Sequence, residues 1–172
     1  SSDGVRLPQS CEGGYDFVGG DFDPSPTDGS DHGTGVASII AAGTDNGVGM
    51  SSLSMNRALV MSLRVADGGY IVSDNLVKAI YFAVYNGADI INMSLSGPAY
   101  NQELADAVAY AQSMGVVIIA SAGNGSNGIG FNIDTSPMYP AVLPGVIAVG
   151  AADSSKSSPM WSNFGERVDV VA

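Results

Sequence analysis

The chain has 172 residues, a length that fits one domain and allows a sizeable hydrophobic core. Six basic residues against 17 acidic ones give a formal net charge of -11. That charge repels phosphate backbones and anionic lipid headgroups, so neither nucleic acid nor a membrane surface is an expected partner. The single cysteine, Cys11, excludes an internal disulfide. No apolar run reaches the roughly 18 residues of a membrane span.

Short apolar runs alternate with longer amphipathic ones, which is typical of a parallel sheet covered by helices. In chain order the expected elements are a polar loop at residues 19–31, a helix at 33–42, a strand at 58–65, a loop at 66–70, a helix at 74–86, a strand at 88–95, a helix at 102–114, and strands at 116–121, 146–151 and 168–171. Ser73 is the expected N-cap of the second helix. The pattern predicts an α/β fold with a three-layer, doubly wound, mostly parallel sheet in a single domain.

Polar and small residues follow two of the expected strands. Ser94-Leu95-Ser96-Gly97 comes after one strand, and Ser121-Ala122-Gly123-Asn124-Gly125 comes after the next. Because the carboxyl ends of parallel strands meet at one edge of a sheet, these two segments are expected to line one crevice.

Two residues are candidates for chemistry, and each has an ordinary alternative. His32 is the only histidine, and the small residues after it leave its imidazole accessible to a reacting proton, but it could equally be a surface residue at a helix start. Asn124 could donate its amide N–H to a developing oxyanion, or it could simply form a tight Gly-Asn-Gly turn. The residue types alone leave both alternatives open.

Several segments together carry a resemblance to one family. They are residues 31–37 (DHGTGVA), 92–96 (NMSLS), 120–124 (ASAGN), 139–141 (YPA), 161–165 (WSNFG) and 168–172 (VDVVA). In this order and at this spacing the chain resembles the subtilisin-like serine proteases, the subtilases. The resemblance implies hydrolysis of peptide bonds through a Ser/His/Asp triad and an Asn oxyanion hole.

The resemblance also implies a role for each matched residue. His32 would be the general base, and Asn124 would be the side-chain donor of the oxyanion hole. The implied substrate-binding residues are an extended edge of Ser94, Leu95, Ser96 and Gly97, an opposite pocket wall of Ser121, Ala122 and Gly123, and a pocket floor of Tyr139 and Pro140. The glycines and alanines of this pocket suggest room for a large apolar side chain.

The sequence departs from the family pattern in three places. The family's nucleophilic serine opens a helix beyond the Ala172 position, so the nucleophile is expected outside these residues, with the domain incomplete at both ends. The nearest match to the triad Asp is Asp3, one residue late in register, which could instead be a turn aspartate. Gly35 stands where the family commonly has a second histidine. The 172 residues alone are therefore predicted to be inactive. The alternatives are a catalytically inactive, peptide-binding subtilase relative and an unrelated α/β binding module.

The chemistry requires no cofactor, but the acidic residues raise the question of structural calcium. The acidic positions are Asp16, Asp21, Asp23, Asp28 and Asp31, and residues 45–49 (DNGVG) lie where many subtilases carry a calcium loop. Calcium prefers such oxygen ligands, although an acidic loop is more often a solvated face, and no ligand is assigned. The expected partners are a peptide or protein substrate and a prosegment, an inhibitor or a complementary chain fragment. Secretion is expected from the family habit.

Overall fold

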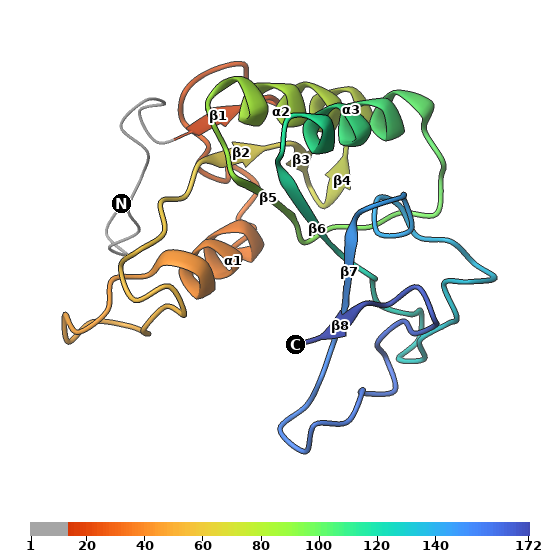
Figure 1. The fold of residues 1–172 in the computed structure, drawn as a ribbon. Coiled ribbons are helices and arrows are strands. Elements are labelled where there is room, and N and C mark those ends of the chain that lie inside the picture. Colours follow the sequence, from red (N-terminus) through yellow and green to blue (C-terminus); the bar gives the residue numbers. More distant parts are fainter. Residues whose placement is uncertain (1–13) are drawn as a thin grey trace. The chain divides into compact units, whose positions relative to one another are not determined.

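A computed structural model describes residues 14–172, and the chain divides into two compact units, one ending at Asn86 and one beginning at Gly87. The first unit contains β1 (Gly14–Asp16), α1 (His32–Ala41), β2 (Ser62–Arg64), β3 (Ala66–Asp67), β4 (Tyr70–Ile71) and α2 (Ser73–Tyr85). The second contains β5 (Ile90–Met93), α3 (Gln102–Ser113), β6 (Val117–Ser121), β7 (Ile147–Gly150) and β8 (Val170–Val171) (Figure 1). The assignment of one incomplete domain stays a prediction. Over residues 14–172, no helix has the length and apolar character needed to cross a bilayer.

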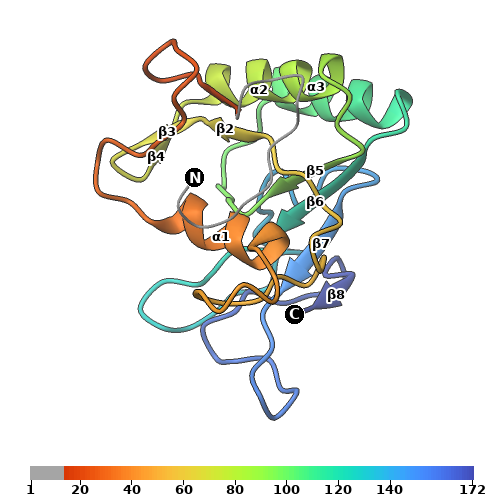
Figure 2. The same cartoon turned by 90° about the vertical axis from the view of Figure 1, so that its left-hand side faces the viewer.

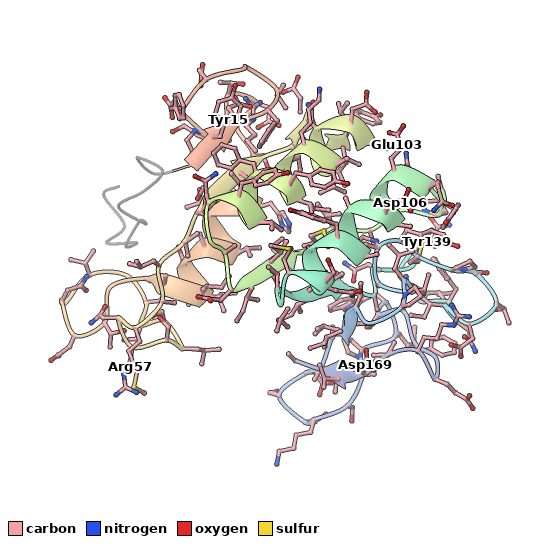
Figure 3. All side chains as sticks on the ribbon, turned by 45° about the horizontal axis from the view of Figure 1, so that its top comes forward. Tyr15, Arg57, Glu103, Asp106, Tyr139 and Asp169 are labelled. Carbon is pink, nitrogen blue, oxygen red and sulfur yellow. The ribbon has the colours of Figure 1, made fainter. Side chains whose placement is uncertain are left out.

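The second unit is built on a parallel sheet in the order β5-β6-β7-β8 (Figures 1 and 2). In its register Met93 lies opposite Ala120, and Ser121 lies opposite Val149. Asp169, labelled in Figure 3, joins β7 to the start of β8, because its carboxylate accepts a hydrogen bond from the Ala148 N–H at 2.8 Å. The carboxyl ends of β5 and β6 therefore lie at one edge of this sheet, as the alternating pattern predicts.

Helix α3 follows the helical period and has a clear start. Its buried residues, Leu104, Ala107, Val108 and Ala111, recur at the three- and four-residue spacing of one helix face. The Asn101 side chain accepts a hydrogen bond from the Leu104 N–H at 2.8 Å, which caps the first turn. Gly115, just beyond the helix, has a φ of +85°, a conformation that glycine adopts without strain. The expected helix at 102–114 is thus confirmed to within one residue.

The first unit corrects three expectations. Strand β1 was not expected, and it pairs in parallel with β2 so that Tyr15 lies opposite Leu63. The predicted loop at 66–70 holds most of an antiparallel hairpin between β3 and β4. Ser73 is the first residue of α2 and not its cap, which is Val72 with no side-chain hydrogen bond. The strands β1, β3 and β4 are two or three residues long and show no period of two. The equally short β2 and β8 were expected because they lie within the longer runs 58–65 and 168–171.

A buried ion pair connects the two strands of the β1–β2 sheet. The Arg64 guanidinium contacts the Asp16 carboxylate at 2.7 Å, and both side chains are less than one-tenth exposed. The same guanidinium also donates to the Thr27 hydroxyl and to Asp67, each at 2.9 Å. Arg64 therefore ties the long loop before α1 to the strand end and the following hairpin.

The surroundings of Asp16 set its pKa. Burial raises the pKa of Asp16, but hydrogen bonds from the Gly19 N–H, the Arg64 guanidinium and the Val18 N–H outweigh burial and leave the pKa below its ordinary value. A carboxylate with a lowered pKa stabilises the folded state above its unfolded pKa and loses that contribution as the pH falls through the folded pKa.

We therefore predict that the free energy of unfolding decreases as the pH falls below the ordinary range of aspartate. Asp16→Asn should lower stability at neutral pH and flatten this decrease, because the charge-assisted bonds are absent at every pH. Urea unfolding at a series of pH values measures both effects. Asp89→Asn, which removes an exposed carboxylate outside the network, is the control and should leave the profile unchanged. If Asp16→Asn left the pH dependence of the unfolding free energy unaltered, the stabilising role assigned to the Asp16 carboxylate would be contradicted.

Candidate functional site

The second unit brings the predicted substrate edge and pocket floor together. Gly97 and Tyr139 exchange two backbone hydrogen bonds: the Gly97 N–H donates to the Tyr139 oxygen at 2.9 Å, and the Tyr139 N–H donates to the Gly97 oxygen at 2.7 Å. All four residues of the edge, Ser94 to Gly97, are half-buried. Pro140, the other predicted floor residue, is fully buried. The edge is thereby held against the floor by a two-residue antiparallel bridge.

The segment after β6 forms a sharp turn that presents Asn124. The Ala122 N–H donates to the Val149 oxygen at 2.8 Å, which continues the pairing with β7 for one residue beyond β6. The Ser121 hydroxyl then accepts a hydrogen bond from the Gly123 N–H at 3.0 Å. Gly123 has a φ of +83°, in the left-handed region that side chains disfavour. Asn124 follows it with an exposed carboxamide, as an oxyanion donor requires.

Asn163 holds this turn from behind. Its buried Nδ2 donates to the Ala122 oxygen at 2.9 Å, and its Oδ1 accepts from the Phe131 N–H at 3.2 Å. Its backbone N–H also donates to the Gly123 oxygen at 3.1 Å. The sequence marked Asn163 only as part of the WSNFG segment and assigned it no role, since its partners lie far away in the chain.

A small apolar cluster lies against the turn. Ala122 and Ile133 are completely buried, Met138 is nearly so, and Phe131 and Val168 pack around them. Because Ala122 belongs to both the turn and the cluster, moving the turn would open a void in the core. Hydrogen bonds and packing therefore act together on the pocket wall.

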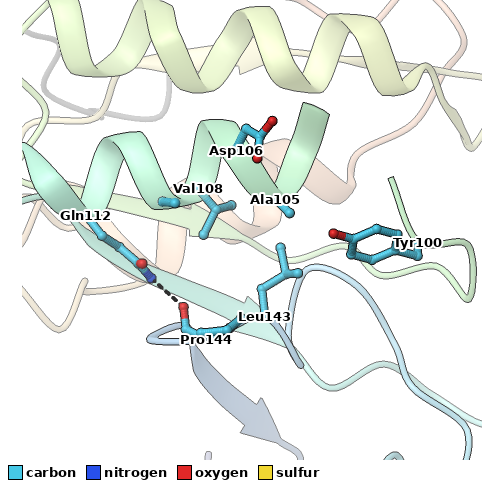
Figure 4. A pocket seen from close by; sticks show the side chains of 8 residues that line it. Tyr100, Ala105, Asp106, Val108, Gln112, Leu143 and Pro144 are labelled. Atoms are coloured by element: carbon cyan, nitrogen blue, oxygen red, sulfur yellow. Dashed lines mark hydrogen bonds between the residues drawn. The ribbon is translucent and has the colours of Figure 1, made fainter. Parts of the chain in front are cut away.

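A cavity of about 320 Å³ lies beside α3 (Figure 4). It is lined by Tyr100, Ala105, Asp106, Val108, Ala109, Gln112, Leu143 and Pro144. The Tyr100 ring meets the Tyr139 ring edge to face, with centroids 5.3 Å apart. None of the predicted site residues lines this cavity, which is therefore distinct from the predicted substrate pocket.

Of the two triad candidates, His32 and Asp3, only His32 lies within the described residues. His32 opens α1 in the first unit, and its residue is exposed. The preceding Asp31 stands at the N-cap position without a side-chain capping bond, and its backbone oxygen accepts the first helical hydrogen bond, from the Gly35 N–H at 2.9 Å. Asp3 and Cys11 lie outside the described residues. The structure thus brings together the residues predicted to form the edge, the pocket wall and the oxyanion donor, and their roles, like those of the base and the acid, stay predictions.

The acidic loop makes local hydrogen bonds within the first unit. Asp23 accepts the Ser25 N–H at 3.1 Å. Asp28 accepts the N–H groups of Ser30 and Gly68, and these bonds hold the pKa of Asp28 below its ordinary value. Between residues 14 and 172, no three His, Cys, Asp or Glu side chains converge as a metal site would require. Structural calcium stays a prediction.

Comparisons with known proteins bear on the family of this chain. A model described as the subtilase family matches residues 10–172. The chain is 40% identical over 161 residues to a thermophilic serine proteinase of Bacillus sp. (strain AK1), covering 92% of this chain and 37% of the relative. It is also 40% identical over 161 residues to subtilisin DY of Bacillus licheniformis, covering 93% of this chain and 56% of the relative. The chain therefore spans about half or less of the length of these relatives.

A solved structure supports the fold. The crystal structure of a lanthipeptide protease superposes with a TM-score of 0.76 at 23% identity, covering 99% of this chain and 50% of the other. The predicted α/β fold with a parallel sheet and flanking helices is confirmed.

The position of Asn163 generates a stability prediction. Asn163→Ala should lower the free energy of unfolding by about 1–3 kcal/mol, because it leaves the carbonyl of the buried Ala122 and the N–H of the half-buried Phe131 without a partner. Urea unfolding measures the loss. The matched control, Asn46→Ala, removes an exposed loop carboxamide bonded to the Val48 N–H and should cost about 0.5 kcal/mol or less. Equal losses in the two variants would show that the carboxamide does not hold the turn.

Proposed function

Because the chain belongs to the subtilase family, we propose that it forms the central part of a serine endopeptidase that hydrolyses peptide bonds. The observation that carries the proposal is the arrangement at the carboxyl ends of β5 and β6. There an extended edge, a glycine turn and an exposed Asn124 lie in one unit, held by the Gly97–Tyr139 bridge and by Asn163. This arrangement suits a peptide lying across the edge with its scissile carbonyl near the asparagine.

In the proposed reaction, His32 takes the proton of the nucleophilic serine as the serine oxygen bonds to the scissile carbonyl carbon. The carbonyl oxygen then becomes an oxyanion, which accepts a hydrogen bond from the Asn124 carboxamide. When the carbon–nitrogen bond breaks, His32 returns the proton to the leaving amine, and water repeats the sequence on the acyl-enzyme. Asp3 is the proposed partner that orients His32, and the nucleophile is proposed to lie beyond these 172 residues.

The backbone pairing suggests which residues of the edge meet the substrate. Both the N–H and the carbonyl of Gly97 are engaged by Tyr139, so Gly97 closes the edge rather than extending it. Strand addition is proposed to involve the segment from Ser94 to Ser96, along which successive side chains alternate between the two sides of the edge. A prosegment or a protein inhibitor would occupy the same edge. Secretion is also part of the proposal, supported by the acidic composition and the family resemblance.

A fluorophosphonate probe, which labels an activated serine, tests the proposed function. The full-length protein that carries these residues should be labelled, and His32→Ala should suppress the labelling because the serine loses its base. The isolated 172-residue chain should stay unlabelled. A labelled serine within the 172 residues would place the nucleophile elsewhere. An unlabelled full-length protein that still binds peptides would identify an inactive, peptide-binding relative.

The oxyanion role gives a kinetic prediction. Asn124→Ala in the full-length protein should lower kcat by about 10²–10³-fold with little change in KM, the loss known for an oxyanion asparagine of a subtilisin. Steady-state hydrolysis of a chromogenic peptide measures it. Asn127→Gly is the matched control in the same loop: Asn127 is exposed with a φ of +54°, which glycine accepts, and kcat should not change. A rise in KM with kcat unchanged would instead assign Asn124 to substrate binding.

A further inference from the structure

We propose that Ser96 restricts the pocket for the residue before the scissile bond to small side chains such as glycine, alanine or serine. This inference rests on the proposed function, which places that pocket between the Ser94–Gly97 edge and the Ser121–Gly123 wall. It reverses the expectation, drawn from the glycines and alanines of the sequence, that the pocket admits a large apolar side chain.

The space around Gly123 carries the proposal. A Cβ placed on Gly123 would collide with the Ser96 hydroxyl oxygen. The same Cβ would lie 3.0 Å from Asn163 Nδ2 and 3.3 Å from the terminal methyl of Met138. The Ser96 side chain therefore reaches from the edge to the opposite wall and touches it at Gly123. A flat ring inserted between two walls needs them about 7 Å apart, twice a carbon contact distance of about 3.5 Å.

Hydrogen bonds prevent both the Ser94–Gly97 edge and the Ser121–Gly123 wall from moving apart to the separation that a ring requires. The edge next to Ser96 is fixed by the two hydrogen bonds between Gly97 and Tyr139. On the other wall, the Gly123 carbonyl is held by the Asn163 N–H at 3.1 Å, and the Ala122 carbonyl is held by the Asn163 side chain. Widening the pocket would break these bonds and disturb the cluster that contains Ala122 and Met138.

The sequence concealed this feature because Ser96 looked like one more small residue. Serine is a small residue, but the Ser96 hydroxyl places an oxygen directly opposite Gly123, which has no side chain. The choice of substrate side chain therefore depends on the pair of Ser96 and Gly123. These residues are 27 positions apart in the sequence, and the fold of the chain brings them into contact.

Hydrolysis by the full-length protein tests the proposal with two p-nitroanilide peptides that differ only in Ala or Phe before the scissile bond. The wild type should prefer Ala by at least about 10-fold in kcat/KM, and Ser96→Gly should raise the Phe-to-Ala ratio by about 10–100-fold. Ser96→Ala, which removes only the colliding oxygen, should give a smaller shift in the same direction. Ser158→Gly, an exposed serine away from the site, is the control and should leave the ratio unchanged.

A wild type that prefers Phe, or a Ser96→Gly variant with an unchanged ratio, would overturn the proposal. If no peptide is hydrolysed, the proposed activity fails, and binding then tests the pocket by itself. The Kd values of two fluorescein-labelled tetrapeptides ending in Ala or Phe should favour Ala in the wild type, and Ser96→Gly should reduce that preference. Equal Kd values, or a preference for Phe, would overturn the pocket assignment without any dependence on catalysis.

Discussion

The hydrogen bonds of the Asn163 carboxamide are the constraint on which the candidate site depends. One buried side chain satisfies the carbonyl of Ala122 and the N–H of Phe131, two backbone groups that no strand pairs. Buried peptide groups without partners are costly, so the turn after β6 can close only where this carboxamide meets it. That turn sets the positions of Gly123, which belongs to the predicted pocket wall, and of Asn124, which is the proposed oxyanion donor.

The opposite wall is held in a different way. The Gly97–Tyr139 bridge uses only backbone groups, and the Tyr139 ring packs on Tyr100, one of the residues that line the neighbouring cavity. The Asn163 carboxamide holds the Ser121–Gly123 wall, and the Gly97–Tyr139 bridge holds the Ser94–Gly97 edge. The distance between the wall and the edge is therefore fixed by these hydrogen bonds. In such a pocket, one hydroxyl is enough to decide which side chains enter, because the surroundings cannot yield to make room.

The first unit shows the same dependence on a long-range polar contact. Arg64 joins Asp16, Thr27 and Asp67, so that a strand, a loop and a hairpin of low intrinsic stability are tied at one point. The Tyr15 and Phe17 rings pack on Phe82 of α2 and add an apolar contact within the same unit. A guanidinium is suited to this position because it donates to several acceptors in one plane.

The sequence by itself determined the helices, most of the strand positions and the edge of the sheet where polar residues gather. Each of these follows from a local pattern: the spacing of Leu104, Ala107, Val108 and Ala111 for a helix, and a serine or asparagine segment after a short apolar run for the sheet edge. It missed β1 and the hairpin, because their two- or three-residue strands stand among glycines and aspartates and not within an apolar run. Only the tertiary structure decided the contacts of Asn163 with Ala122, of Ser96 with Gly123 and of Arg64 with Asp16. The two hydrogen-bonded pairs are separated by 41 and 48 residues, and the path of the whole chain brings them together.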